Sequence, residues 1–135
     1  MEELYNYNLN DSDIKEMIYS NPEILYLDKE EIIALVNILI KINCSEKQIR
    51  NILLTNPFYL SRCISDIKEL IKRFNELNLK TLNILFDTNP WLLNKDVFEI
   101  DNYINKKINH GYILEEIILN IDNNPFIIDE EEYLW

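Results

Sequence analysis

Four Asn-Pro dipeptides divide this chain at nearly equal intervals, and they hold its only prolines. The prolines are at positions 22, 57, 90 and 125, so successive prolines are 35, 33 and 35 residues apart. A constant period of about 20–50 residues is typical of chains built from similar units that stack on one another. The spacing therefore predicts several copies of one unit, each containing the same proline turn.

Apolar residues around each proline predict a short helix that ends at the Asn-Pro dipeptide. They recur eight and four residues before the proline and three residues after it. The sets are Ile14, Ile18 and Leu25; Ile49, Leu53 and Leu60; Leu82, Phe86 and Leu93; and Ile117, Ile121 and Ile128. A spacing of four places side chains on one helix face, and proline disfavours helical geometry in the residue before it. We expect each Asn to favour the turn and to bond nearby backbone.

A longer helix is expected after each turn, at about 29–42, 65–78 and 97–109. The clearest apolar stripe holds Ile67, Leu70, Ile71, Phe74 and Leu77. Capping boxes are predicted at three helix starts, formed by Asp28 with Glu31, Ser45 with Gln48, and Asp96 with Glu99. The long helices end near Asn43, Asn78 and Gly111, residue types that accept the left-handed conformation of a helix end.

These elements predict one all-α domain, a short α-solenoid of about three and a half units. Each unit is a short helix, a proline turn and a longer helix. The units are expected at about 12–43, 44–78, 79–110 and 111–128, and an acidic C-terminal tail at 129–135. Stacked units of this kind offer an extended surface made of equivalent helices.

The pattern resembles the mitochondrial transcription termination factor (mTERF) repeat family over roughly residues 12–128. The best match covers residues 44–60 and continues through Ile67, Leu70, Ile71 and Leu77. The resemblance implies repeats of two helices with a short third turn around a proline, and it implies nucleic-acid binding. Members of the family commonly carry a glycine near the end of the long helix, and here only Gly111 does so.

Composition favours a cytoplasmic protein without a membrane segment. Hydrophobic residues make up 47% of the chain, yet charged residues interrupt every long apolar run. The acidic start Met1-Glu2-Glu3 lacks the core of a signal peptide and the Arg-rich character of a mitochondrial transit peptide. Frequent Ile, Asn, Lys and Tyr suggest an A/T-rich genome of a bacterium or phage. Cys44 and Cys63 are expected to pack as small residues at helix ends, without a disulfide.

Basic residues are concentrated in the second unit. Residues 41–80 carry eight basic and four acidic side chains, whereas both flanking segments are strongly acidic. Candidate phosphate or anion contacts are Lys47, Arg50, Lys68, Lys72 and Arg73. The alternatives are an ordinary solvated helix face, which we favour, and attraction to an acidic patch on a partner or a second copy.

The net charge of −11 disfavours nucleic acid as the ligand. Binding to nucleic acid depends on cations that displace counterions along the phosphates, and a basic footprint is its usual mark. The eight basic side chains of one unit are enough to contact a few phosphates. They do not make a continuous basic groove across all units. We weight this charge above the family resemblance, because one fold serves many ligands.

The sequence offers no catalytic or cofactor-binding pattern. The single histidine, His110, is placed to cap a helix end, and one glycine cannot build a phosphate-binding loop. The acidic run at 129–132 is expected to be a solvated tail, with a divalent-ion site there as a weaker alternative. We therefore predict no catalytic residues, no metal, no cofactor and no enzymatic activity. An unfamiliar carboxylate site is a remote alternative.

Aromatic residues are the candidate protein contacts. Phe58, Trp91 and Phe126 each follow a proline, where the first unit has Glu23. Packing between units is the favoured interpretation, and an exposed aromatic ladder is the alternative. Tyr133 and Trp135 end the chain, either as a cap over the last half unit, which we favour, or as a docking peptide.

Two functions remain from this reasoning. The first is a small acidic adaptor or inhibitor that binds a protein partner of basic character, such as a protein that handles nucleic acid. The second is an mTERF-like nucleic-acid-binding regulator that uses the basic second unit.

Overall fold

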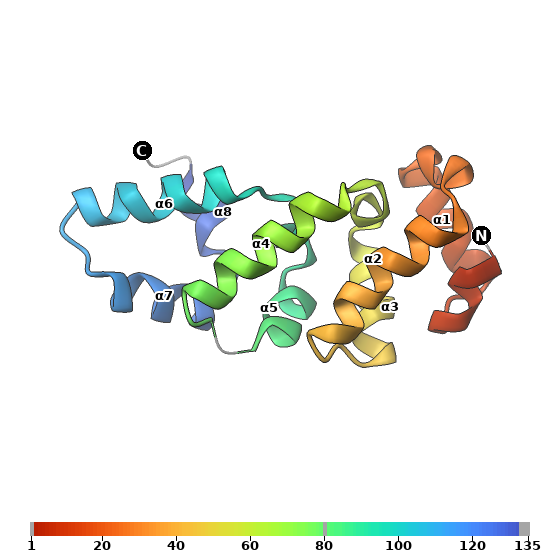
Figure 1. Ribbon diagram of the computed structural model, residues 1–135, viewed down its shortest axis with the longest axis horizontal. Helices are drawn as coiled ribbons and strands as arrows, with labels where there is room; N and C mark the ends of the chain where they lie inside the picture. Colours follow the sequence, from red (N-terminus) through yellow and green to blue (C-terminus); the bar gives the residue numbers. More distant parts are fainter. Residues whose placement is uncertain (1, 80, 133–135) are drawn as a thin grey trace.

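The computed structural model describes residues 2–79 and 81–132, and within these ranges it is helical without strands (Figure 1). The predicted all-α class is confirmed. In chain order the elements are η1 (Glu2–Tyr7), α1 (Asp11–Ser20), η2 (Pro22–Tyr26), α2 (Lys29–Lys41), α3 (Glu46–Thr55), η3 (Pro57–Ser61), α4 (Ile64–Glu76), α5 (Leu82–Thr88), η4 (Pro90–Asn94), α6 (Val97–Asn109), α7 (Leu114–Asn123) and α8 (Ile127–Glu132), where η marks a 3-10 helix.

The helices follow one another in chain order along the long axis of the molecule (Figure 1). Short helix α3 packs against both α1 and α5, and long helix α4 packs against both α2 and α6. Helix α7 packs against α6 and α8. The predicted helices are therefore present, with α3 between α1 and α5 and α4 between α2 and α6. The 3-10 helix η1, which the sequence pattern did not predict, packs against α2 and α3 and buries Leu4.

The four Asn-Pro turns share one backbone geometry. The Asn residues have φ between −141° and −129° and ψ between 75° and 88°, outside the helical region, as the following proline requires. Each Asn N–H still donates to the carbonyl four residues earlier and so closes the short helix. After the first three prolines, where the sequence predicted a short turn, the chain makes the 3-10 helices η2, η3 and η4.

The side chains of the same Asn residues join neighbouring units, a role that the sequence did not reveal. The Nδ2 of Asn21, Asn56 and Asn89 donates to the backbone carbonyl of the next unit's proline, at 3.2, 3.0 and 2.9 Å. All three Asn residues are buried. The expectation of bonds to nearby backbone is thus wrong for these side chains, because their acceptors lie 34 to 36 residues away.

The fourth Asn makes its side-chain bonds within its own half unit. Asn124 Nδ2 donates instead to Glu130 of α8, at 3.0 Å, and Asn124 Oδ1 accepts from the N–H of Phe126. Asn124 is only partly buried. The Asn side chain of the last half unit therefore bonds a residue of that half unit, whereas the other three Asn side chains bond the next proline carbonyl.

The long helices end in left-handed residues, as predicted. Asn43, Asn78 and Gly111 have φ of 71°, 60° and 96°. In each case the N–H of the next residue donates back to the carbonyl five residues earlier, which is the bond of a Schellman end. Asn is the residue with a side chain that best tolerates this conformation, so two Asn residues stand in for the missing glycines.

The predicted helix starts are partly correct. Ser45 and Gln48 form a complete capping box, and the Asp96 side chain accepts from the N–H of Glu99. The prediction at Asp28 is wrong, because its side chain makes no capping bond to α2. An additional box at the start of α1 joins Asn10 and Asp13. It was missed because its third position holds Asp in place of Glu or Gln.

The first unit has an exposed outer end. Leu60, Leu93 and Ile128, three residues after their prolines, are buried, whereas the equivalent Leu25 is 54% exposed. The first unit has a neighbouring unit on one side only, and this asymmetry explains the difference. Leu25 is therefore useful as an exposed leucine whose replacement should disturb little of the core.

Candidate functional site

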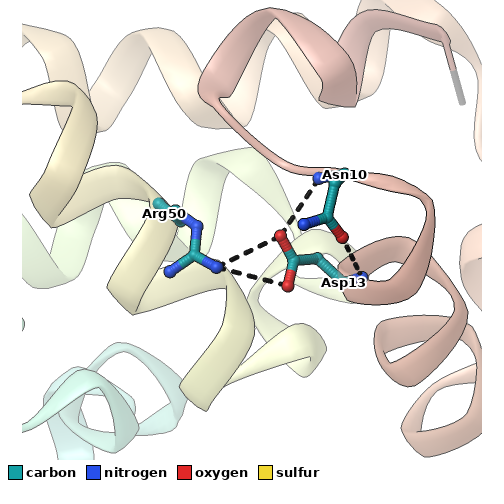
Figure 2. Close-up of polar contacts among 3 residues, drawn as sticks. All are labelled: Asn10, Asp13 and Arg50. Atoms are coloured by element: carbon teal, nitrogen blue, oxygen red, sulfur yellow. Dashed lines mark hydrogen bonds and ion pairs between the residues drawn. The ribbon is translucent and has the colours of Figure 1, made fainter.

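Arg50, one of the predicted anion contacts, forms an ion pair with a carboxylate of the same chain. Its Nη2 lies 3.3 and 3.2 Å from the two carboxylate oxygens of Asp13, in the first unit (Figure 2). Asp13 also accepts from the N–H of Asn10, so one carboxylate caps α1 and holds the arginine. The Arg50 guanidinium thus links α3 to α1.

Two further arginines of the basic segment make similar contacts toward the third unit. The predicted candidate Arg73 donates to the Asp101 carboxylate on α6 at 2.7 Å. Arg62 donates from Nε to the Leu93 carbonyl at 3.1 Å and from Nη2 to the Lys95 carbonyl at 2.9 Å. Much of the positive charge in residues 41–80 therefore serves to join units.

The three lysines of the predicted set are exposed, and they do not form one cluster. Lys68 and Lys72 lie on α4, and Lys47 lies in the first turn of α3, in the other helical layer. Lys68 lines a small cavity of about 230 Å³ together with Lys41 of α2. The structure thus leaves a short row of lysines on the α2 and α4 surface.

The aromatic residues after the prolines are half-exposed at equivalent positions, and we call these three residues the aromatic row. Phe58, Trp91 and Phe126 are 42%, 42% and 41% exposed, respectively. The rings of Phe58 and Trp91 lie 6.3 Å apart between centroids and are tilted by 38°. Phe58 and Trp91 therefore pack on each other while part of each ring faces solvent, and the role of the three rings as protein contacts stays a prediction. The predicted contacts Tyr133 and Trp135 lie outside the described residues.

The sequence predicted a solvated tail at the acidic run 129–132, and the structure makes this run helical instead of irregular. It lies in helix α8, and Asp129 pairs with the Nζ of Lys95 at 2.7 Å. Lys95 is buried and also lies 3.6 Å from Glu99. This ion pair attaches α8 to the start of α6. Within the described residues, no three His, Cys, Asp or Glu side chains are grouped as metal ligands.

The two cysteines lie in different environments, and the expectation that both are packed is wrong for Cys63. Both thiols are free; Cys44 is buried and Cys63 is exposed. Burial raises the pKa of the Cys44 thiol to about 12. Hydrogen bonds from the Ser65 hydroxyl and from N–H groups at the start of α4 lower the pKa of the Cys63 thiol below its usual value.

We expect one fast-reacting thiol in the folded protein. An aromatic disulfide reagent at pH 8 should modify Cys63 at once, and its rate should rise with pH and level off at a lower pH than the rate of an unperturbed cysteine does. Cys44 should react only after unfolding in urea, because it is buried and protonated. Cys63→Ser should abolish the fast phase. Two fast thiols in the folded wild-type chain would contradict this assignment.

No family model, curated protein or solved structure matches this chain. None of the helices in the described part of the chain has the length and apolar character that crossing a bilayer requires.

Proposed function

We propose that this chain is a non-enzymatic binding protein, a small acidic adaptor or inhibitor that docks a protein partner of basic character. We further propose that it is a short α-solenoid of about three and a half mTERF-like units, located in the cytoplasm of a bacterium or encoded by its phage. The support for the solenoid is the recurrence of helix, proline turn and helix, joined by equivalent Asn side chains.

The row of aromatic side chains is the observation that carries the proposal. Phe58, Trp91 and Phe126 come from equivalent positions in successive units, and each exposes about two fifths of its surface. Aromatic residues supply a large apolar area with few rotatable bonds, and tryptophan is enriched among the residues that dominate protein interfaces. A regular row of such rings suits a partner that lies along the units.

The ion pairs of the arginines favour a protein partner over nucleic acid. Arg50 and Arg73 are held by carboxylates of neighbouring units, so a phosphate would have to compete with these carboxylates. The overall charge of −11 opposes the approach of a polyanion. It favours the approach of a basic protein for the same reason.

The first test measures nucleic-acid binding directly. Fluorescence anisotropy with labelled duplex and single-stranded DNA and RNA should show no saturable binding at about 50 mM salt, where a phosphate-binding protein binds best. The opposite result is saturable binding of nucleic acid with a steep salt dependence. This binding would be lost with Lys68→Glu and Lys72→Glu and kept with Lys15→Glu. It would replace the adaptor with the mTERF-like nucleic-acid-binding alternative.

The second test asks whether the aromatic row holds a protein. The tagged chain is used to capture partners from a lysate of the organism that encodes it, and the bound proteins are cross-linked and identified. A protein held through the row should be lost with Phe58→Ala and Trp91→Ala together. Phe98→Ala is the matched control, since Phe98 is 76% exposed on α6 and lies outside the row. Equal loss with both variants would contradict the assigned surface.

A further inference from the structure

Helix α5 is three residues shorter than its equivalents, and two missing chain positions account for most of this difference. Helices α1, α3 and α7 have ten residues each, whereas α5 has seven. The left-handed residues Asn8, Asn43 and Gly111 lie fourteen positions before the next proline, but Asn78 lies only twelve before Pro90. The shorter spacing of the third unit therefore falls in α5. At 1.5 Å per residue, this helix is about 4.5 Å shorter than the others.

A groove lies beside the N-terminal end of the shortened helix α5. Helices α5 and α7 are joined near their C-terminal ends by the bond from Asn89 to Pro125, at 2.9 Å. Among the described residues they otherwise approach less closely than α3 approaches α1 or α5. A cavity of about 720 Å³ lies between the end of α4, the start of α5 and one face of α7 along its full length. We call this cavity the α5/α7 groove.

The groove has apolar walls and an acidic margin. Leu77 and Thr81 line one side, and Leu114, Ile118 and Leu119 of α7 line the other. Leu119 is 58% exposed and Leu114 is 40% exposed, which is unusual for leucines on a helix that faces a neighbour. Glu115 and Asp122 also line it, and none of its described lining residues is basic.

We propose that the α5/α7 groove docks an amphipathic helix that carries Lys or Arg beside its apolar face. A helix laid into an apolar groove is a common mode of peptide recognition, and here the occupant would fill space that a full-length α5 would take. The acidic margin selects basic flanks over acidic ones. This inference rests on the proposed protein-binding function and adds the class of segment bound, at a site separate from the aromatic row.

A designed peptide tests the groove without knowledge of the natural partner. The probe is a labelled helical peptide of 16 residues with Leu at every third or fourth position and Lys on both flanks. The matched peptide carries Glu in place of Lys. Fluorescence anisotropy with the full chain should show saturable binding of the Lys peptide, and binding at least about tenfold weaker for the Glu peptide.

A pair of leucine variants locates the binding site. Leu119→Lys should weaken binding of the Lys peptide at least about tenfold, because it removes an apolar contact and adds a repelling charge. Leu25→Lys makes the same chemical change at a leucine of similar exposure in the first unit, 54% against 58%, and should alter affinity less than about twofold. Unchanged circular dichroism of both variants confirms that they are folded.

Several results would overturn the proposal. These are absence of saturable binding, equal loss with both leucine variants, and equal binding of the Glu peptide. Sedimentation that shows a dimer dissolved by Leu119→Lys would make a second copy the occupant and would also overturn it. If the peptide fails while a natural partner still depends on Phe58 and Trp91, the groove inference falls and the proposed function stands. If the natural ligand is nucleic acid, the proposed function falls, even where the Lys peptide binds the groove.

Discussion

Replacing Asn56 by alanine is expected to lower the free energy of unfolding by about 2–4 kcal/mol, because it leaves several buried polar groups without partners. Asn56 Nδ2 donates to the Pro90 carbonyl at 3.0 Å and to Asn94 Oδ1 at 2.9 Å, and Asn56 Oδ1 accepts from Asn94 Nδ2 at 3.0 Å. Asn56 is fully buried, so water cannot replace these bonds. Urea unfolding followed by circular dichroism measures the loss.

The fourth Asn supplies a matched control for this prediction. Asn124 has the same backbone geometry and the same position before a proline, but it is only partly buried and bonds Glu130 within its own unit. Asn124→Ala should therefore cost less than about 1 kcal/mol, as expected for a solvated hydrogen bond. If the two variants lose the same stability, the contacts between units do not account for the burial of Asn56.

The second large effect is expected at Phe86, where alanine should lower the free energy of unfolding by about 3–5 kcal/mol. The Phe86 ring is fully buried on α5 and lies 5.7 Å from the ring of Phe74 on α4, measured between centroids. Removing it leaves a cavity between α4 and α5 and loses the apolar area that the ring buries there. The same unfolding measurement applies.

Ile84→Ala is the control on the same helix. Ile84 is also apolar, but it is 53% exposed, so its removal takes little area out of the core. A loss of less than about 1 kcal/mol is expected from the small area that it buries. A similar loss for Ile84→Ala and Phe86→Ala would show that α5 is stabilised as a helix and not by its packing on α4.

The helices were predictable because their signals are local. The spacing of Ile67, Leu70 and Phe74 places them on one face, and the structure buries all three. Ser45 with Gln48 formed the expected box at a helix start. Prolines mark the helix ends by a steric rule that does not depend on the rest of the molecule. The residue pairs involved are at most a few positions apart, so the sequence contains the whole interaction.

The contacts between units were not predictable in the same way, because they depend on register. Arg50 was assigned to a possible anion site, and its actual partner Asp13 lies 37 residues earlier. A signal was present, since partners separated by about one period are brought side by side when units stack. Asn51 donates to the Asp87 carboxylate, 36 residues away, by the same logic. Reading polar residues at this separation would have identified the buried Asn residues as well.

The α5/α7 groove could not be predicted from the sequence for a different reason. The shorter interval of 33 residues was visible from the start, but the spacing of prolines alone did not tell which element was shortened. The left-handed conformation of Asn78 settles the question, because it fixes the end of α4 and leaves α5 as the shortened helix. The exposed face of α7 then follows from the missing turn opposite it.

The bond from Asn124 to Glu130 has a consequence for self-assembly. Copies of a stacked chain can add end to end into filaments when the last unit exposes the same Asn amide donor that joins the inner units. Here the final amide is already satisfied by a carboxylate six residues further along the chain. A second copy of the chain would therefore have to displace Glu130 before it could stack on this edge through the same contact.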